Sequence, residues 1–198
     1  MAQTPSTMVS LGNPANHFNL PDVVSGKQVS LADLAGGKGL LVMFICAHCP
    51  FVMLINEQLA ALGRDYGAKG LKIVAICSND VTTHPDDAPE KLKAQAETFG
   101  FTFPYLYDRT QEVAKLYQAA CTPDFFLYDA ERRLAYRGQL DDARPKNGKP
   151  VTGKDLRAAI DAVLAGKAPS ATQTPSIGCN IKWTPGNEPA YATAAAGS

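Results

Sequence analysis

The chain has 198 residues, its 19 Lys and Arg are balanced by 19 Asp and Glu, and 45% of its residues are hydrophobic. This length and composition predict a single globular domain over residues 1–198. The zero net charge argues against a nucleic-acid-binding protein, because neutralising phosphates requires an excess of Lys and Arg. The longest strongly apolar stretch, residues 39–45, is too short to cross a bilayer, and residues 1–10 lack a secretory-signal pattern. We therefore expect a cytoplasmic protein without membrane or nucleic-acid partners.

Strand-like and helix-like segments alternate along the first half of the chain. A short hairpin is expected within residues 20–34. Residues 39–45 and 71–77 are continuous apolar runs, which is typical of strands buried on both faces. Between them, apolar residues recur at helical spacing over about residues 51–62, so a helix is expected there after Pro50.

The second half continues the alternation. The expected elements are a helix over residues 90–99, a strand over 104–107, a helix opened by a capping box of Asp108 and Gln111, paired strands over 124–128 and 134–137, and a last helix capped by Thr152 and Asp155 that runs to about 164. This order predicts an α/β three-layer sandwich with a mixed central sheet and an N-terminal β-hairpin. Residues 167–198 are expected to form an irregular tail that packs back on a core of about residues 12–166.

A Cys-x-x-Cys motif lies where a buried strand is followed by a helix, at Cys46-Ala47-His48-Cys49-Pro50. A chain of this size needs no stabilising disulfides, so in a reducing cell the motif indicates redox or metal chemistry. Unpaired N–H groups at the start of the helix favour a thiolate on Cys46, and a protonated His48 adds to this effect. The spacing also allows Cys49 to close a small disulfide ring. We therefore expect Cys46 and Cys49 to be catalytic, with His48 in support.

A metal site is the rival interpretation of the two cysteines. Zinc normally has four ligands, and the other Cys and His residues do not form a second pair with ligand spacing. No metal is therefore expected, although Cys121, Cys179 or His48 could complete such a site in space. The polar loop over residues 78–87 contains His84, Asp86 and Asp87, which we interpret as turn and cap residues rather than a metal or acid–base cluster.

Several longer segments, the motif among them, are similar to one family of proteins. These segments are residues 17–22, 26–31, 44–52 and 121–129, and also residues 136–142 and 175–183. The chain resembles the thioredoxin-fold redoxins over about residues 12–183, specifically the AhpC/TSA (peroxiredoxin-like) family. The last two segments are similar to its peroxiredoxin-like subgroup, which has a C-x-H-C-P active-site stretch. The resemblance implies a thioredoxin-like α/β/α sandwich.

The chain departs from the peroxidases of that family. True peroxiredoxins have a P-x-x-x-T-x-x-C motif, and alignment of its cysteine with Cys49 puts Val42 at the proline and Cys46 at the threonine. The family's arginine is also missing, since that position falls at about Thr122-Pro123. The resemblance instead implies the thioredoxin arrangement, in which Pro123 is a cis-proline that faces the two cysteines.

These observations predict a thiol:disulfide oxidoreductase that acts by dithiol–disulfide exchange. We expect the Cys46 thiolate to attack a substrate disulfide, the mixed disulfide to lie against the Thr122–Pro123 backbone, and Cys49 to release the reduced substrate. Cys121 and Cys179 are candidate additional redox thiols, with a structural role as the alternative for each. Two other functions stay open, a thiol peroxidase or antioxidant protein with Cys121 or Cys179 as resolving thiol, and a copper- or zinc-binding module.

The predicted chemistry requires no cofactor, because the thiols themselves transfer the electrons. The expected partners are a protein with a disulfide or dithiol, or a small thiol, together with an external reductant such as a thioredoxin or glutathione system.

Overall fold

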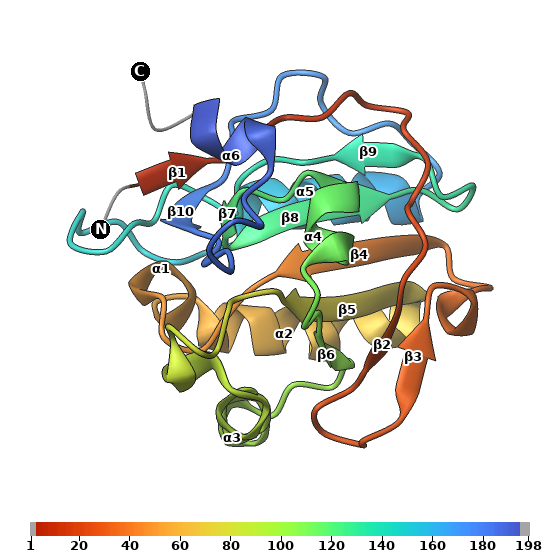
Figure 1. Ribbon diagram of the computed structural model, residues 1–198. Helices are drawn as coiled ribbons and strands as arrows, with labels where there is room; N and C mark the ends of the chain where they lie inside the picture. The colour runs from red at the N-terminus through yellow and green to blue at the C-terminus, as the bar shows by residue number, and fades with distance from the viewer. Residues whose placement is uncertain (1–2, 195–198) are drawn as a thin grey trace.

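A mixed five-stranded sheet lies at the centre of the computed structural model, which describes residues 3–194 (Figure 1). Its strands, in spatial order, are β6 (Tyr105–Tyr107), β5 (Leu71–Cys77), β4 (Gly39–Phe44), β8 (Asp124–Tyr128) and β9 (Leu134–Tyr136). Strands β4, β5 and β6 run parallel, whereas β8 and β9 are antiparallel to their neighbours. The predicted mixed sheet is confirmed. All six residues of β4 are buried, as a continuous apolar run requires.

Helices cover both faces of this sheet. Because successive side chains of a strand point to opposite faces, Leu41, Met43 and Ile45 pack in one core with helices α2 (Asn56–Tyr66), α3 (Pro89–Phe99) and α5 (Lys154–Leu164). The alternate residues Leu40, Val42 and Phe44 form a second core with helix α4 (Glu112–Tyr117). The three-layer α/β/α arrangement is therefore confirmed. Short 3-10 helices lie at Ala32–Leu34, Gly67–Lys69 and Pro85–Asp87.

The expected N-terminal hairpin is present as β2 (Asn19–Pro21) and β3 (Gln28–Ser30). Two local predictions are wrong. The single helix expected over about residues 51–62 is split into α1 (Pro50–Met53) and α2, because the backbone leaves helical geometry at Ile55. The capping box also fails, since α4 begins only at Glu112 and Asp108 instead accepts a hydrogen bond from the Ala114 N–H at 2.9 Å.

The tail expected to be irregular contributes the middle strand of a second sheet. Strand β10 (Ile177–Asn180) pairs antiparallel with β1 (Gln3–Pro5) on one side and with β7 (Cys121–Thr122) on the other. A last helix, α6, covers Ala190–Ala194. Strand β7 leads directly into β8, so this second sheet is held beside the carboxyl end of β4 (Figure 1). Within residues 3–194, no helix has both the length and the apolar character needed to cross a membrane.

Candidate active site

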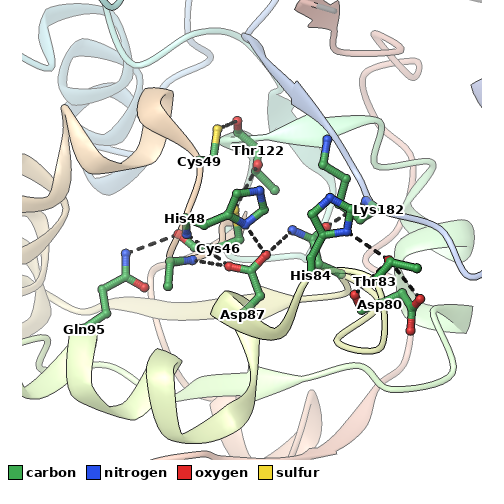
Figure 2. A network of polar contacts seen from close by, with 12 residues as sticks. Cys46, His48, Cys49, Asp80, Thr83, His84, Asp87, Gln95, Thr122 and Lys182 are labelled. Carbon is green, nitrogen blue, oxygen red and sulfur yellow. Dashed lines mark hydrogen bonds and ion pairs between the residues drawn. The ribbon is translucent and has the colours of Figure 1, made fainter. Parts of the chain in front are cut away.

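The two cysteines of the motif lie at the junction between β4 and α1 and converge on one threonine (Figure 2). The Cys46 Sγ is 3.4 Å from the Thr122 hydroxyl oxygen, and the Cys49 thiol donates to the Thr122 carbonyl oxygen at 3.2 Å. Both cysteines are fully buried and neither is in a disulfide. The Thr122–Pro123 peptide bond is cis, as the resemblance implies. Four of the residues expected at the site are thus brought together.

Asp87 binds the two-residue spacer Ala47-His48 between the cysteines, a role that the sequence did not predict. Its buried carboxylate accepts hydrogen bonds at Oδ1 from the backbone N–H groups of Ala47, at 2.8 Å, and of His48, at 3.1 Å. Its Oδ2 accepts from His48 Nδ1 at 2.5 Å and from Asn79 Nδ2 at 2.7 Å. The interpretation of Asp87 as a turn or cap residue is therefore wrong. The available signal was its place in the loop after β5, because such loops lie at the carboxyl edge of the sheet, beside the motif.

His48 pairs with Asp87 rather than with a thiol. The hydrogen bond to Asp87 raises the pKa of His48 above its ordinary value, against the opposing effect of partial burial. The His48 ring also stacks on the ring of His84, with centroids 5.3 Å apart. Burial and the neighbouring His48 charge lower the pKa of His84. Asp87 therefore holds the His48 ring and favours its protonated form, and the interaction of His48 with Cys49 is electrostatic rather than a hydrogen bond.

The electrostatics of the two thiols differ from the prediction. Burial, a hydrogen bond with Cys49 and the negative charge of Asp87 raise the pKa of Cys46. Hydrogen bonds from Cys179 and Cys46 lower the pKa of Cys49, although burial opposes them, and the Val52 N–H adds to the lowering. These pKa directions favour Cys49 over Cys46 as the thiolate, in contrast to the expectation, while the thiol form of Cys49 is the one that donates to the Thr122 carbonyl oxygen. Helix α1 begins at Pro50, so Cys49, not Cys46, is the cysteine next to its first N–H groups.

A buried glutamine fixes the backbone at Cys46. The Gln95 amide nitrogen donates to the Cys46 carbonyl oxygen at 3.2 Å and to Asn56 Oδ1 at 2.9 Å. The Gln95 amide oxygen accepts from the Tyr105 hydroxyl at 3.1 Å. Three elements, α2, α3 and β6, are joined in this way beneath the motif. The sequence offered no signal for this role, because Gln is common on exposed helix faces.

The structure separates the two additional thiols by their surroundings. Cys179 lies on β10 opposite Thr122 and hydrogen-bonds the Cys49 sulfur. Cys121 points its thiol at the Pro123 carbonyl oxygen, 3.5 Å away, and burial raises its pKa well above the ordinary value. Among the described residues, Cys179 therefore interacts with a thiol of the motif, whereas the Cys121 thiol is directed at the backbone of Pro123.

A metal ion is a poor fit to these residues. The ligand atoms of Cys46, His48 and Asp87 lie within 4.8 Å of one another. However, both oxygens of Asp87 already accept hydrogen bonds, and His48 Nδ1 is one of their donors. A cation at this position would displace bonds that hold the spacer of the motif. These side chains are therefore better described as a hydrogen-bond network than as metal ligands.

Comparison with known proteins yields a family and several relatives. The model of the AhpC/TSA family matches residues 11–137. The thiol-disulfide oxidoreductase ResA of Geobacillus kaustophilus is 32% identical over 129 residues, which cover 64% of this chain and 67% of that protein.

Solved structures include two much more similar proteins. An uncharacterized conserved protein from Geobacillus kaustophilus is 51% identical with a TM-score of 0.91, covering 93% of this chain and 98% of that one. A hypothetical protein from Sinorhizobium meliloti is 56% identical with a TM-score of 0.90, covering 92% and 100%. The thioredoxin domain of a thiol-disulfide oxidoreductase from Bacteroides vulgatus shares the fold at 22% identity, with a TM-score of 0.55 and coverage of 65% and 88%. The predicted thioredoxin-like fold is confirmed.

Proposed function

The chain belongs to the AhpC/TSA family, and from this premise we propose that it is a thiol:disulfide oxidoreductase whose redox pair is Cys46 and Cys49. Relatives named thiol-disulfide oxidoreductases support an oxidoreductase role at modest identity. The observation that supports the finer assignment most directly is the convergence of both thiols on Thr122, beside a cis-proline. Both thiols border the same residue, which is the arrangement that closure of a small disulfide ring between them requires.

In the proposed reaction the Cys49 thiolate attacks one sulfur of a substrate disulfide. A Cys49–substrate disulfide forms, the substrate S–S bond breaks, and the departing sulfur leaves as a thiolate that takes up a proton. Cys46, on losing its proton, then attacks the Cys49 sulfur, which forms the Cys46–Cys49 disulfide and releases the second substrate thiol. This order is the reverse of the one expected from the sequence, because the negative charge is better stabilised on Cys49.

The cycle transfers two electrons to the substrate and leaves the enzyme oxidised. An external dithiol of the thioredoxin or glutathione type would reduce the Cys46–Cys49 disulfide and close the cycle. Such reductants belong to the cytoplasm, which we retain as the proposed location. The same steps in reverse oxidise a substrate dithiol.

Substrate access requires a local movement. Neither Cys46 nor Cys49 has exposed surface. The cavity beside Pro123, which Phe51 and Ser176 also line, has a volume of only about 20 Å³. That volume holds about one water molecule. We therefore propose that α1 or β10 shifts when a substrate disulfide reaches Cys49.

Reduction of insulin by dithiothreitol tests the proposed activity. We expect turnover in the wild type and its loss in Cys46→Ser and in Cys49→Ser. Cys77→Ala is the matched control, because Cys77 is a buried cysteine of β5 outside the motif. Wild-type turnover in both serine variants would overturn the assignment of the pair.

The order of attack has a separate test. At slightly acidic pH, a disulfide reagent such as dithiodipyridine reacts with the thiol that is already ionised. We expect Cys49 in Cys46→Ser to react faster than Cys46 in Cys49→Ser, with the modified residue located by mass spectrometry. Faster reaction at Cys46 would restore the order expected from the sequence.

A thiol peroxidase is the second candidate, and one observation favours it. The thiolate is stabilised on Cys49, which is the cysteine that aligns with the attacking cysteine of peroxiredoxins, and Cys179 lies beside it. The proline, threonine and arginine of that motif are replaced, which argues for the exchange enzyme instead. Hydrogen peroxide consumption far above the rate of free cysteine would favour the peroxidase, and a rate equal to that of free cysteine would exclude it.

A further inference from the structure

The C-terminal strand β10 lies directly against the loop that holds both active-site thiols. Cys179 is paired with Thr122, and Asn180 with Cys121, in an antiparallel register. The backbones approach closely, because a Cβ added at Gly178 would lie 2.0 Å from the Thr122 carbonyl oxygen. Only glycine allows this contact, so the sequence of β10 is adapted to bring the next residue, Cys179, to the site.

The thiol of Cys179 reaches the sulfur on which the exchange chemistry centres. Cys179 is buried, with 1% of its surface exposed, and its thiol hydrogen-bonds the Cys49 sulfur. Cys49 therefore has two thiol neighbours, Cys46 from its own motif and Cys179 from the tail. Disulfide formation needs sulfurs that can approach to about 2 Å and β-carbons about 4 Å apart. The register that sets Cys179 opposite Thr122 places it beside the residue that both thiols of the motif contact, so only a short approach to Cys49 is needed.

Strand β10 occupies the edge of β7 at which an extended substrate would bind. An extended substrate held against the Thr122–Pro123 backbone would use the free edge of β7 beside the thiols. In this structure β10 occupies that edge, and its cysteine stands opposite Thr122. Cys179 is thus placed where the cysteine of such a substrate would lie.

A second set of contacts holds the tail in this register. The Lys182 N–H donates to Asn79 Oδ1 at 2.8 Å, and the Asp80 N–H donates to the Lys182 carbonyl oxygen at 2.8 Å. Asn79 in turn donates to Asp87, which binds the spacer of the motif. The position of β10 is therefore coupled to the segment that contains Cys46 and Cys49 (Figure 2).

We propose that Cys179 is an internal exchange partner of Cys49, so that the disulfide of this enzyme can move from Cys46–Cys49 to Cys49–Cys179. This inference rests on the proposed function. The hydrogen bond with Cys49 and burial raise the pKa of Cys179 in the reduced protein, and the first of these causes ends when Cys49 is in a disulfide. In the step, Cys179 gives up its proton and its sulfur attacks the Cys49 sulfur of the Cys46–Cys49 disulfide. The Cys49–Cys179 bond forms, the Cys46–Cys49 bond breaks, and Cys46 leaves as a thiolate that takes up the proton lost by Cys179. The number of disulfides is unchanged, so the step needs no oxidant. It attaches the tail strand to α1 and returns Cys46 to the thiol form.

The test is oxidation of the Cys46→Ser variant with oxidised glutathione, followed by alkylation and peptide mapping under non-reducing conditions. We expect Cys49 and Cys179 to lose their alkylatable thiols together and to appear in one disulfide-linked peptide pair. The matched control is Cys46→Ser/Cys179→Ser, in which Cys49 is expected to accumulate as a mixed disulfide with glutathione. The inference is overturned if Cys46→Ser also accumulates only that mixed disulfide while Cys179 stays reduced.

A measurement on the wild type tests the same inference even if the Cys46→Ser variant does not fold. After partial oxidation and rapid acid quenching, peptide mapping should detect Cys49–Cys179 in addition to Cys46–Cys49. Its absence from a wild type that forms Cys46–Cys49 would also refute the inference. Insulin turnover by the wild type tests the proposed function separately, so turnover without any Cys49–Cys179 bond would overturn the role of Cys179 alone.

Discussion

Replacement of Asp87 by asparagine separates the charge of this residue from its shape. The asparagine keeps one oxygen, which can still accept from the Ala47 and His48 N–H groups, but it places an NH₂ group where Oδ2 was. When His48 is protonated, that NH₂ faces two donors, His48 Nδ1 and Asn79 Nδ2. Rotation of the Asn79 amide does not remove the conflict, because its oxygen already accepts from the Lys182 N–H.

The expected loss follows from those contacts. A hydrogen bond to a charged group contributes about 1.5–3 kcal/mol, and a buried polar group left unsatisfied costs about 1–3 kcal/mol. The His48 side chain is 19% exposed, so solvent screens part of the first contribution. We expect Asp87→Asn to lower the free energy of unfolding by about 3 kcal/mol near pH 6.

The loss should depend on pH with a definite sign. The pKa of His48 is raised, so its stabilisation is complete below the ordinary value of 6.5 and fades as the pH rises through the raised value. For Asp87, hydrogen bonds from His48 and Asn79 outweigh burial and lower the pKa, so its stabilisation is present above the ordinary 3.8 and fades as the pH falls through the lowered value. The variant should therefore lose most between these two ordinary values, and less in alkaline solution.

Urea unfolding of the wild type and Asp87→Asn at about pH 5.5 and about pH 9 measures both effects. Asp86→Asn is the matched control, because Asp86 is exposed in the same 3-10 helix, and a change within about 0.5 kcal/mol is expected there. A loss below about 1 kcal/mol at the lower pH, or an equal loss at both, would refute the reasoning about the ion pair.

Two further predictions concern the packing around Thr122. Gly178→Ala should destabilise the protein by about 3 kcal/mol or more and speed alkylation of the active-site thiols, because the new methyl group overlaps the Thr122 backbone. The control Gly67→Ala adds a methyl group in open space and should do neither. Unfolding curves and thiol labelling measure both effects, and equal behaviour of the two variants would contradict the prediction. Burial raises the pKa of Asp124 to about 7, so wild-type stability should fall by about 1.4 kcal/mol per pH unit from the ordinary 3.8 toward that value, and Asp124→Asn should remove this slope. An unchanged slope of unfolding free energy against pH in the variant would show that Asp124 does not titrate in this range.

The main sheet and the position of the motif were predictable because they depend on local patterns. The apolar runs over residues 39–45 and 71–77 indicate strands buried on both faces, and β4 and β5 match them closely. A Cys-x-x-Cys placed between such a strand and a helical pattern follows from the same reasoning. The break at Ile55 was not visible, because the apolar spacing of α1 and α2 is continuous across it.

The contacts that complete the site depend on tertiary structure and were beyond such patterns. Strand β10 is four residues long, too short for its alternation to be distinguished from irregular chain, and its partners are more than fifty residues away or at the other end of the sequence. Asp87 resembles any acidic residue of a polar loop, and only its burial against the motif identifies its role. The lowering of the Cys49 pKa depends in turn on Cys179 of β10, so it could not be predicted before that strand was placed.

A redox titration of the wild type tests the central claim most directly. The protein is equilibrated in dithiothreitol or glutathione buffers from about −150 to about −350 mV, then alkylated and mapped by mass spectrometry. The account predicts that the Cys46 and Cys49 thiols disappear together in a two-electron transition within this range, as a disulfide-linked pair. Both thiols remaining alkylatable throughout, with no disulfide at Cys49, would contradict it.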